Sequence, residues 1–321
     1  MEAIVETREL TRRYGDTLAL DHLTLAIPPG AIFGFIGPNG AGKTTTMRIL
    51  TTLLTPSDGE AWVAGRSVLR EPLEVRKVVG FMPDFFGVYD NMKVWEYLDF
   101  FGRAYGIAPG RRSSLIGELL ELVDLGHKRD AFVMGLSRGM KQRLSLARTM
   151  IHDPTLLILD EPASGLDPRA RIELRELLKE LRSLGKTVMI SSHILTELAE
   201  MCTHIAIIER GKLLASGDVQ TILRSLQPHR TLEIRTLGAA EQAELLLQSR
   251  DDVLGLRRAD EHSPGSDPSA QTLLVDFTGD EAGMGALLAR LVAAGVPVTR
   301  FAEQSSDLED IFMQVTKGIV Q

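Results

Sequence analysis

The segment Gly37–Thr44, which reads Gly-Pro-Asn-Gly-Ala-Gly-Lys-Thr, restricts the possible folds of this chain more than any other feature. It follows the short apolar run Ala31–Ile36 and precedes the helical pattern of Thr44–Leu54, so it is expected to join a buried strand to a helix. Glycines allow backbone N–H groups to converge on phosphate oxygens, and the helix start adds its positive dipole end. The sequence therefore predicts a phosphate-binding loop between strand and helix.

A P-loop of this kind assigns roles to individual residues. Lys43 is expected to reach the β- and γ-phosphates of a nucleotide, and the Thr44 hydroxyl to bind Mg²⁺. A flexible glycine-rich turn without a ligand is the alternative, and the complete spacing between a strand and a helix argues against it. The predicted nucleotide-binding residues of the loop are Gly37, Pro38, Asn39, Gly40, Ala41, Gly42, Lys43, Thr44 and Thr45.

A pair of carboxylates follows the apolar run Leu156–Leu159. Because a buried strand does not tolerate an unpaired charge, carboxylates at its end usually meet a cation. Asp160 is therefore the candidate Mg²⁺ ligand, and Glu161 the candidate base that polarises an attacking water. By itself this pattern indicates only the end of a strand, so its interpretation depends on the phosphate-binding loop upstream.

Strand and helix patterns alternate along the first two thirds of the chain, which predicts an α/β fold with a largely parallel sheet. A helical block from 91 to 149 interrupts this alternation and predicts an inserted helical subdomain at about 88–150. Helices are also expected at 169–184 and 195–201. The expected strands lie at 3–9, 17–25, 31–36, 156–159, 187–191 and 204–209, with a further strand pair at 60–63 and 78–82.

Charge is distributed unevenly along the chain, whose formal net charge is −7. Residues 1–225 contain 28 basic and 28 acidic side chains, whereas residues 226–321 contain 8 basic and 15 acidic ones. The change occurs at Ser225–Pro228, where the proline also breaks the preceding helical pattern. We therefore expect two domains, at 1–225 and 226–321.

The acidic C-terminal domain is expected to be a small α+β unit. Its patterns follow the order β-α-β-β-α-β, which resembles a ferredoxin-like unit. Because it contains none of the nucleotide-binding patterns, we expect it to serve dimer contact or regulation. The expected strands are 231–236, 253–258, 272–277 and 296–302, the expected helices are 239–249 and 280–294, and 308–316 is a closing helix.

Three further motifs carry a family resemblance. Leu136–Gln142, which reads Leu-Ser-Arg-Gly-Met-Lys-Gln, resembles the signature motif of ATP-binding cassettes. Ser164–Asp167 resembles the D-loop, and His193 follows a strand at the position of the switch histidine. With the P-loop, these motifs occur in the family's order over residues 3–222. The sequence therefore resembles the ATP-binding subunit of an ABC transporter.

This resemblance implies ATP and Mg²⁺ as cofactors and adds residues to the expected site. It places Ser137 and Gly139 near the γ-phosphate bound by the opposite subunit, with Asp167 in the D-loop as a further cofactor-binding residue. It makes His193 a catalytic residue that contacts the γ-phosphate. It places the ring of Tyr14 against adenine.

The sequence departs from the family pattern at three positions. Arg138 and Met140 stand where the signature motif has glycine and glutamine. Asp84 stands where the family has the glutamine of its Q-loop. A carboxylate there is still able to ligate Mg²⁺ or its water, so Asp84 is retained as a candidate catalytic and metal-binding residue.

Aromatic side chains are concentrated directly after Asp84. Trp95 and Phe101, with Leu98, are expected in the core of the helical subdomain. Phe85, Phe86 and Tyr89 either fill the same core or remain exposed in the groove in which the family docks a short helix of its membrane subunit.

The resemblance implies an ATPase that powers a separate integral-membrane permease, with a second copy of the chain completing the catalytic pair. The longest apolar runs are too short to span a bilayer, and the single cysteine fits a reducing compartment. We therefore expect a cytoplasmic protein that its permease holds peripherally on the inner face of the cell membrane. Ser306–Phe312 resembles the closing helix of ATPase subunits of drug and lipid exporters of the ABC-2 type, although an ordinary amphipathic helix is the alternative.

A non-transport ABC ATPase acting on DNA, ribosomes or cofactor assembly is the competing interpretation. Only 93 positions separate Lys43 from Leu136, which leaves no room for the long coiled coil of chromosome-associated members. The chain has one cassette, whereas ribosome-associated members usually have two. The balanced charge of residues 1–225 also gives no basic footprint for nucleic acid, so no nucleic-acid partner is expected.

Overall fold

The computed structural model describes residues 3–84, 87, 89, 91–194, 198, 201–226, 230–259 and 270–303. The chain divides into two compact units, Met1–Ile222 and Leu223–Gln321. Within the described residues, no helix is long and apolar enough to cross a membrane.

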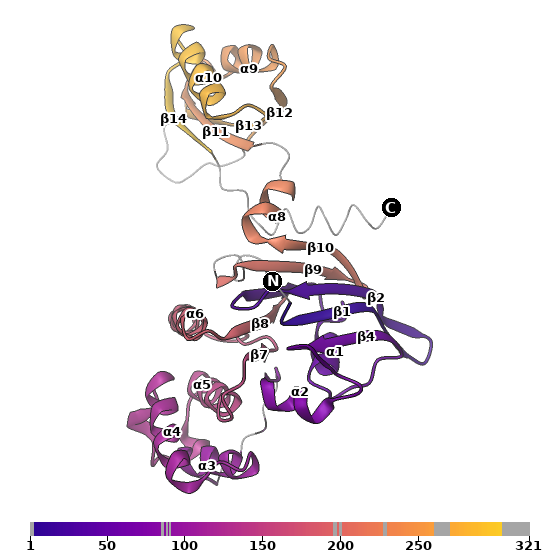
Figure 1. Cartoon of the computed structure of the whole chain (residues 1–321). Helices are drawn as coiled ribbons and strands as arrows, with labels where there is room; N and C mark the ends of the chain where they lie inside the picture. The colour runs from indigo at the N-terminus through magenta and orange to yellow at the C-terminus, as the bar shows by residue number, and fades with distance from the viewer. Residues whose placement is uncertain are drawn as a thin grey trace. The chain divides into compact units, whose positions relative to one another are not determined.

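The centre of the first unit is a six-stranded sheet with the order β10-β9-β3-β8-β7-β6 (Figure 1). Strands β3, β6, β7, β8 and β9 run parallel, and only β10 pairs antiparallel. Every residue of β3, β7 and β8 is buried. This agrees with the continuous apolar sequences of β3 and β7, whereas β8 also buries the hydroxyl side chains of Thr187, Ser191 and Ser192. The bounds are β3 Ile32–Ile36, β6 Val79–Met82, β7 Leu156–Leu159, β8 Thr187–Ser192, β9 His204–Glu209 and β10 Lys212–Asp218.

The N-terminal strands form a separate antiparallel sheet with the order β2-β1-β4-β5. The expected pairing of strands 60–63 and 78–82 is therefore wrong, because β4 belongs to this sheet and β6 to the parallel one. Both segments carry a local strand pattern, but partner choice depends on the whole fold. The bounds are β1 Val5–Tyr14, β2 Thr17–Ile27, β4 Asp58–Val63 and β5 Arg66–Ser67.

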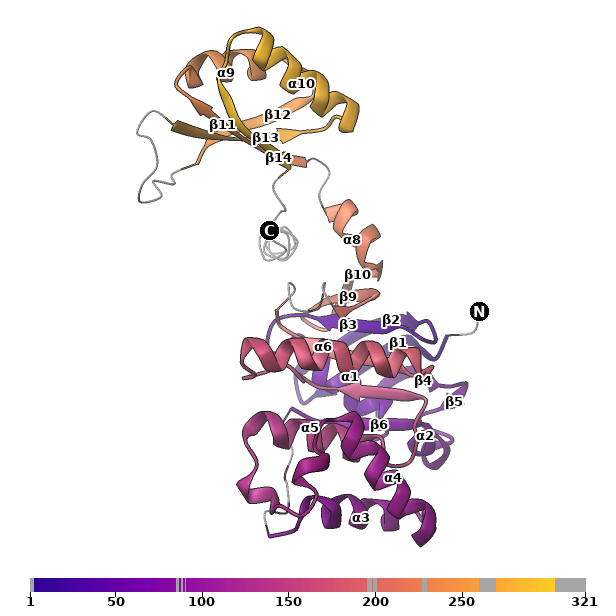
Figure 2. The ribbon, with the colours of Figure 1, turned by 90° about the vertical axis from the view of Figure 1, so that its left-hand side faces the viewer.

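Three helices form the inserted subdomain between β6 and β7, and α3 and α4 lie away from β9 and β10 in both views (Figures 1 and 2). Helix α1 ends at Leu50, earlier than expected, because Thr52 adopts a left-handed backbone with φ of 61°. The bounds are α1 Lys43–Leu50, α2 Pro72–Val78, α3 Val94–Ala104, α4 Pro109–Leu122, α5 Arg138–Thr149, α6 Pro168–Ser183 and α8 Val219–Leu226. Two short 3₁₀ turns lie at Gly126–Lys128 and Val133–Gly135.

The second unit contains an antiparallel sheet with the order β12-β13-β11-β14, and α9 and α10 cover one face of it (Figure 2). Its elements follow the expected β-α-β-β-α-β order, and each adjacent pair of strands is antiparallel. The bounds are β11 Arg230–Leu237, α9 Ala240–Gln248, β12 Val253–Arg258, β13 Ala270–Phe277, α10 Glu281–Ala293 and β14 Val298–Glu303. The expected closing helix at 308–316 lies outside the described residues.

Candidate functional site

The phosphate-binding loop begins where β3 ends and runs into α1, as its sequence predicts. A Cβ on Gly37 would lie 2.3 Å from the carbonyl oxygen of Ile208, so no side chain fits there. Gly42 has φ of 108°, and a Cβ there would lie 2.7 Å from the carbonyl oxygen of Ala19. At these two positions glycine is therefore required by close backbone approach, which shapes a cradle of backbone groups at the helix start.

Lys43 is folded back over this loop. Its Nζ donates hydrogen bonds to the carbonyl oxygens of Gly37, at 2.6 Å, and Pro38, at 3.3 Å, and lies 3.6 Å from Oε1 of Glu161. Burial lowers the pKa of the Lys43 ammonium below its usual value, and the negative charge of Glu161 opposes that shift. The ammonium thus lies between the loop and the carboxylate pair, where an added phosphate would meet it.

Asp160 is held from both sides at the end of β7. Its side chain is 1% exposed. Oγ1 of Thr44 donates to Oδ2 at 2.8 Å, and Oγ of Ser191 donates to Oδ1 at 2.5 Å. A hydroxyl and a carboxylate in contact form a hard oxygen pair of the kind Mg²⁺ uses together with nucleotide phosphates. The described residues contain no group of three or more His, Cys, Asp or Glu able to hold a metal ion.

Glu161 has an unusual backbone conformation for its residue type. Its φ is 50°, in the left-handed region, which costs a non-glycine residue about 1–3 kcal/mol. Its N–H donates to Oγ of Ser191 at 2.8 Å, and its Oε2 lies 3.0 Å from Nδ1 of His193. The structure therefore brings Lys43, Glu161 and His193 together, with the carboxylate between the two basic groups.

Asp84 lies at the same edge of the sheet. It comes two residues after Met82, whose carbonyl oxygen accepts a hydrogen bond from the N–H of Asp160 at 2.8 Å. Its side chain is exposed. Its catalytic and metal-binding role stays a prediction.

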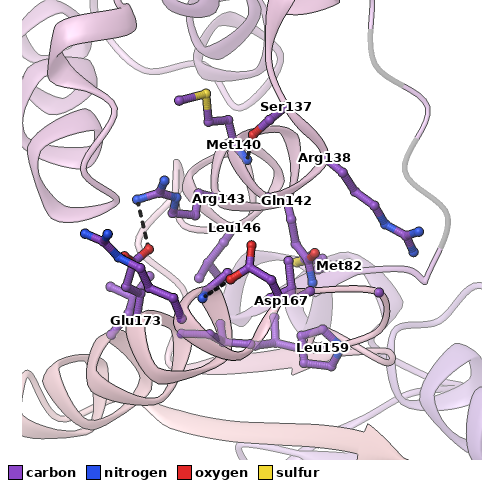
Figure 3. Close-up of a pocket in the computed structure, with 18 residues that line it drawn as sticks. Met82, Ser137, Arg138, Met140, Gln142, Arg143, Leu146, Leu159, Asp167 and Glu173 are labelled. Atoms are coloured by element: carbon purple, nitrogen blue, oxygen red, sulfur yellow. Dashed lines mark hydrogen bonds and ion pairs between the residues drawn. The ribbon is translucent and has the colours of Figure 1, made fainter.

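The residues expected from the signature motif and the D-loop line a different pocket of about 370 Å³ between α5 and α6 (Figure 3). Ser137 begins α5, where its hydroxyl accepts from the N–H of Met140, and Asp167 begins α6, where its carboxylate accepts from the N–H of Ala170. Gly139 also lines this pocket. Among the described residues that line this pocket, none comes from the P-loop, so one chain holds the expected nucleotide contacts in two separate groups.

Arg138 links the signature helix to the D-loop. Its Nη2 donates to the carbonyl oxygen of Ser164 at 3.1 Å. Its guanidinium packs over Gly165, where a Cβ would lie 2.4 Å from Cζ. The sequence identifies this arginine only as a departure from the family pattern, and the structure shows that it bridges two of the motifs.

Tyr14 ends β1 and is 44% exposed, with the guanidinium of Arg12 4.7 Å from its ring centroid. The ring is therefore accessible from solvent. Its contact with adenine stays a prediction.

A groove of about 750 Å³ lies beside the loop that follows β6. The described residues that line it include Arg48, Arg76 and Arg148 and contain no acidic side chain. Aromatic rings also line it, with Tyr105 stacked on His152 at 4.0 Å between ring centroids. The lining of the groove thus combines aromatic and basic side chains.

The aromatic side chains after Asp84 divide between core and surface. Leu98 is fully buried as expected, whereas Trp95 is half-buried and Phe101 is half-buried and lines the groove. Tyr89 is 54% exposed. Phe85 and Phe86 lie outside the described residues.

Ser191 is the site residue that the sequence analysis missed. It is fully buried and contacts both Asp160 and Glu161. The local signal is the pair of serines that ends an otherwise apolar strand, and serine is also an ordinary residue where a strand passes into a turn.

Comparison with known proteins gives a consistent result. Residues 20–164 match the family described as ABC transporter. The chain is 40% identical over 225 residues to Nod factor export ATP-binding protein I of Cupriavidus metallidurans, covering 70% of this chain and 74% of that protein. It is 33% identical over 319 residues to bacitracin transport ATP-binding protein BcrA of Bacillus licheniformis, covering 99% of both. A solved structure of an ATP-binding subunit of an ABC transporter superposes with a TM-score of 0.63 at 28% identity, covering 69% of this chain and 92% of the other.

Proposed function

The chain belongs to the ABC transporter family, and from this premise we propose that it is the ATP-hydrolysing subunit of an exporter whose membrane-spanning permease is a separate protein. The observation that carries the proposal is the convergence of Lys43, Asp160, Glu161 and His193 at the mouth of a glycine-formed phosphate cradle. The names of the relatives concern Nod factor export and bacitracin transport, so both support a transport role and the first supports the export direction.

The chain's own residues supply binding, orientation and proton acceptance. Lys43 exchanges the carbonyl oxygens it now contacts for phosphate oxygens, while the backbone N–H groups of the loop hold the same phosphates. Thr44 and Asp160 would hold Mg²⁺, which offsets phosphate charge when bound. Glu161 orients the attacking water and accepts its proton, and His193, hydrogen-bonded to the same carboxylate, fixes its direction.

A second copy of the chain completes the site in this proposal. One chain holds the P-loop group and the signature group in separate places, and a closed two-fold pair allows each P-loop to face the partner's signature helix. Ser137, Gly139 and Asp167 would then contact nucleotide bound to the other copy. We propose residues 1–225 as the ATPase domain and residues 226–321 as a dimerisation or regulatory domain.

The basic groove supports a permease as the partner. Three arginines in its lining, with no acid among its described lining residues, favour a partner segment that carries carboxylates beside apolar side chains. We propose that a short acidic, amphipathic helix of the permease docks there. In this proposal the docked permease holds the protein on the inner face of the cell membrane, and no nucleic-acid partner is expected.

Replacement of Glu161 by glutamine tests the catalytic part of the proposal. The variant should bind ATP with near wild-type affinity, lose at least about a hundredfold in turnover and accumulate ATP-bound dimers, because an amide cannot accept the proton. Turnover is measured by phosphate release and dimerisation by size-exclusion chromatography with light scattering. Wild-type turnover in this variant would show that Glu161 is not the catalytic base.

The transport part is tested by purifying the full chain from detergent-solubilised membranes of its native host. Co-purification of a hydrophobic protein with several membrane spans is the expected result. Recovery with ribosomes or DNA instead would contradict transport and favour the non-transport ABC ATPase, while leaving the ATPase assignment intact.

A further inference from the structure

We infer that Ser191 is a positioning residue that sets the Mg²⁺-binding carboxylate of Asp160 and the catalytic carboxylate of Glu161 relative to each other. This inference rests on the proposed function, because it concerns how the same site is built. Ser191 lies at the end of β8, the strand that separates the P-loop strand β3 from the carboxylate-bearing strand β7.

The hydroxyl of Ser191 uses both of its hydrogen-bonding capacities on the two carboxylate residues. Its Oγ donates a hydrogen bond to Oδ1 of Asp160, with 2.5 Å between the two oxygens. The same Oγ accepts a hydrogen bond from the backbone N–H of Glu161, with 2.8 Å between nitrogen and oxygen. Side chains that lack a hydroxyl cannot reproduce this pair of bonds from a single atom. Since Ser191 is fully buried, water cannot readily replace the hydroxyl.

Each of the two bonds fixes a different property of the site. The bond to Oδ1 leaves Oδ2 of Asp160 directed at Thr44, 2.8 Å away, so the oxygen pair expected to hold Mg²⁺ is oriented. The bond from the Glu161 N–H holds that residue in its left-handed backbone conformation, with φ of 50°, which directs its side chain toward Lys43 and His193. One buried hydroxyl therefore couples the metal-binding oxygen to the catalytic base.

The same strand end also contacts the phosphate-binding loop. Ser191 is in register with Phe35 of β3, and the carbonyl oxygen of Ser192 accepts the N–H of Gly37 at 3.4 Å. The end of β8 thus links the loop to the carboxylate pair through the sheet itself. A change at Ser191 should consequently alter metal affinity and turnover together, while nucleotide binding by the loop changes little.

The test compares Ser191→Ala with Ser191→Thr, which keeps a hydroxyl on the same Cβ. The matched control is Ser145→Ala, since Ser145 is also fully buried and its hydroxyl has no partner among the described residues. The full-length chain is used throughout. Three quantities are measured: kcat and KM for ATP by phosphate release, Mn²⁺ affinity in the presence of ATP by electron paramagnetic resonance, and melting temperature.

Ser191→Ala should lower kcat by about tenfold to a hundredfold and weaken Mn²⁺ binding by about tenfold, with KM for ATP changed less than about threefold. Ser191→Thr should recover most of both losses, and Ser145→Ala should match the wild type. Wild-type kcat and Mn²⁺ affinity in a folded Ser191→Ala variant would overturn the inference. If the alanine variant does not fold, a folded Ser191→Thr variant that loses both properties would overturn it equally.

The outcome is separable from that of the proposed function. A wild-type chain that does not hydrolyse ATP would refute the ATPase, whereas the Mn²⁺ measurement would still decide the role of Ser191. A wild-type chain that hydrolyses ATP, together with an unaltered Ser191→Ala variant, would refute only the positioning role.

Discussion

Replacement of Thr44 by valine removes one hydroxyl from the best-defined contact of the site. Valine has nearly the same shape and helix propensity as threonine, so the main change is the loss of the 2.8 Å hydrogen bond to Oδ2 of Asp160. A hydrogen bond to a charged group contributes about 1.5–3 kcal/mol to stability. Because Thr44 is only half-buried and Asp160 keeps its bond from Ser191, we expect the lower end, about 1.5 kcal/mol.

Urea denaturation followed by tryptophan fluorescence measures this difference. Both tryptophans, Trp62 and Trp95, lie in the first unit, so the signal reports the ATPase domain. With an m value of about 2–3 kcal/mol/M, the midpoint should fall by about 0.5–0.75 M. Thr45→Val is the control, because the Thr45 hydroxyl makes no hydrogen bond to the described residues. Equal midpoints for the two variants, measured without nucleotide or metal, would refute this account of how Asp160 is held.

Three further predictions concern other parts of the molecule. Gly37→Ala should weaken ATP binding by about tenfold or more, because the added Cβ displaces the loop from the carbonyl oxygen of Ile208. Calorimetry measures this affinity, and a wild-type value in the variant would contradict the prediction. Burial lowers the pKa of His152 below its usual 6.5, so the neutral form is favoured in the folded state and stability is lost as pH falls below about 6.5. His152→Phe should therefore show a smaller fall in melting temperature between about pH 7.5 and 5.5 than the wild type. Equal falls in the variant and the wild type would argue against this effect of His152. Deletion of residues 226–321 should spare ATP binding and weaken dimerisation or coupled transport, and unchanged sedimentation and transport would leave that domain without the proposed role.

The elements that carry the nucleotide chemistry are predictable from sequence because each is a local pattern. An apolar run followed by Gly37–Thr44 and a helical pattern specifies strand, loop and helix without reference to the rest of the chain. Leu156–Leu159 with its two carboxylates is local in the same sense. The strands β3, β7 and β8 run parallel and end at one edge of the sheet, and there Glu161 contacts both Lys43 and His193.

The antiparallel sheet of the first unit is an example of what local patterns leave undecided. Residues 60–63 and 78–82 both have strand character, yet one joins β1 and the other joins β7. Likewise, the end of α1 depends on the left-handed residue Thr52, and threonine is not a residue that marks such a position in sequence. Pairing and termination follow from packing of the whole domain.

A phosphate-binding loop, a carboxylate pair and a signature motif in the order of an ABC cassette can be recognised from residue type and spacing along short stretches. The hydrogen bond from Ser191 to Asp160, 31 positions away, and the one from Arg138 to the carbonyl of Ser164, 26 positions away, are visible only in the folded chain. These bonds form between neighbouring elements, and the order of strands and helices in space is set by burial of the entire core rather than by any local pattern.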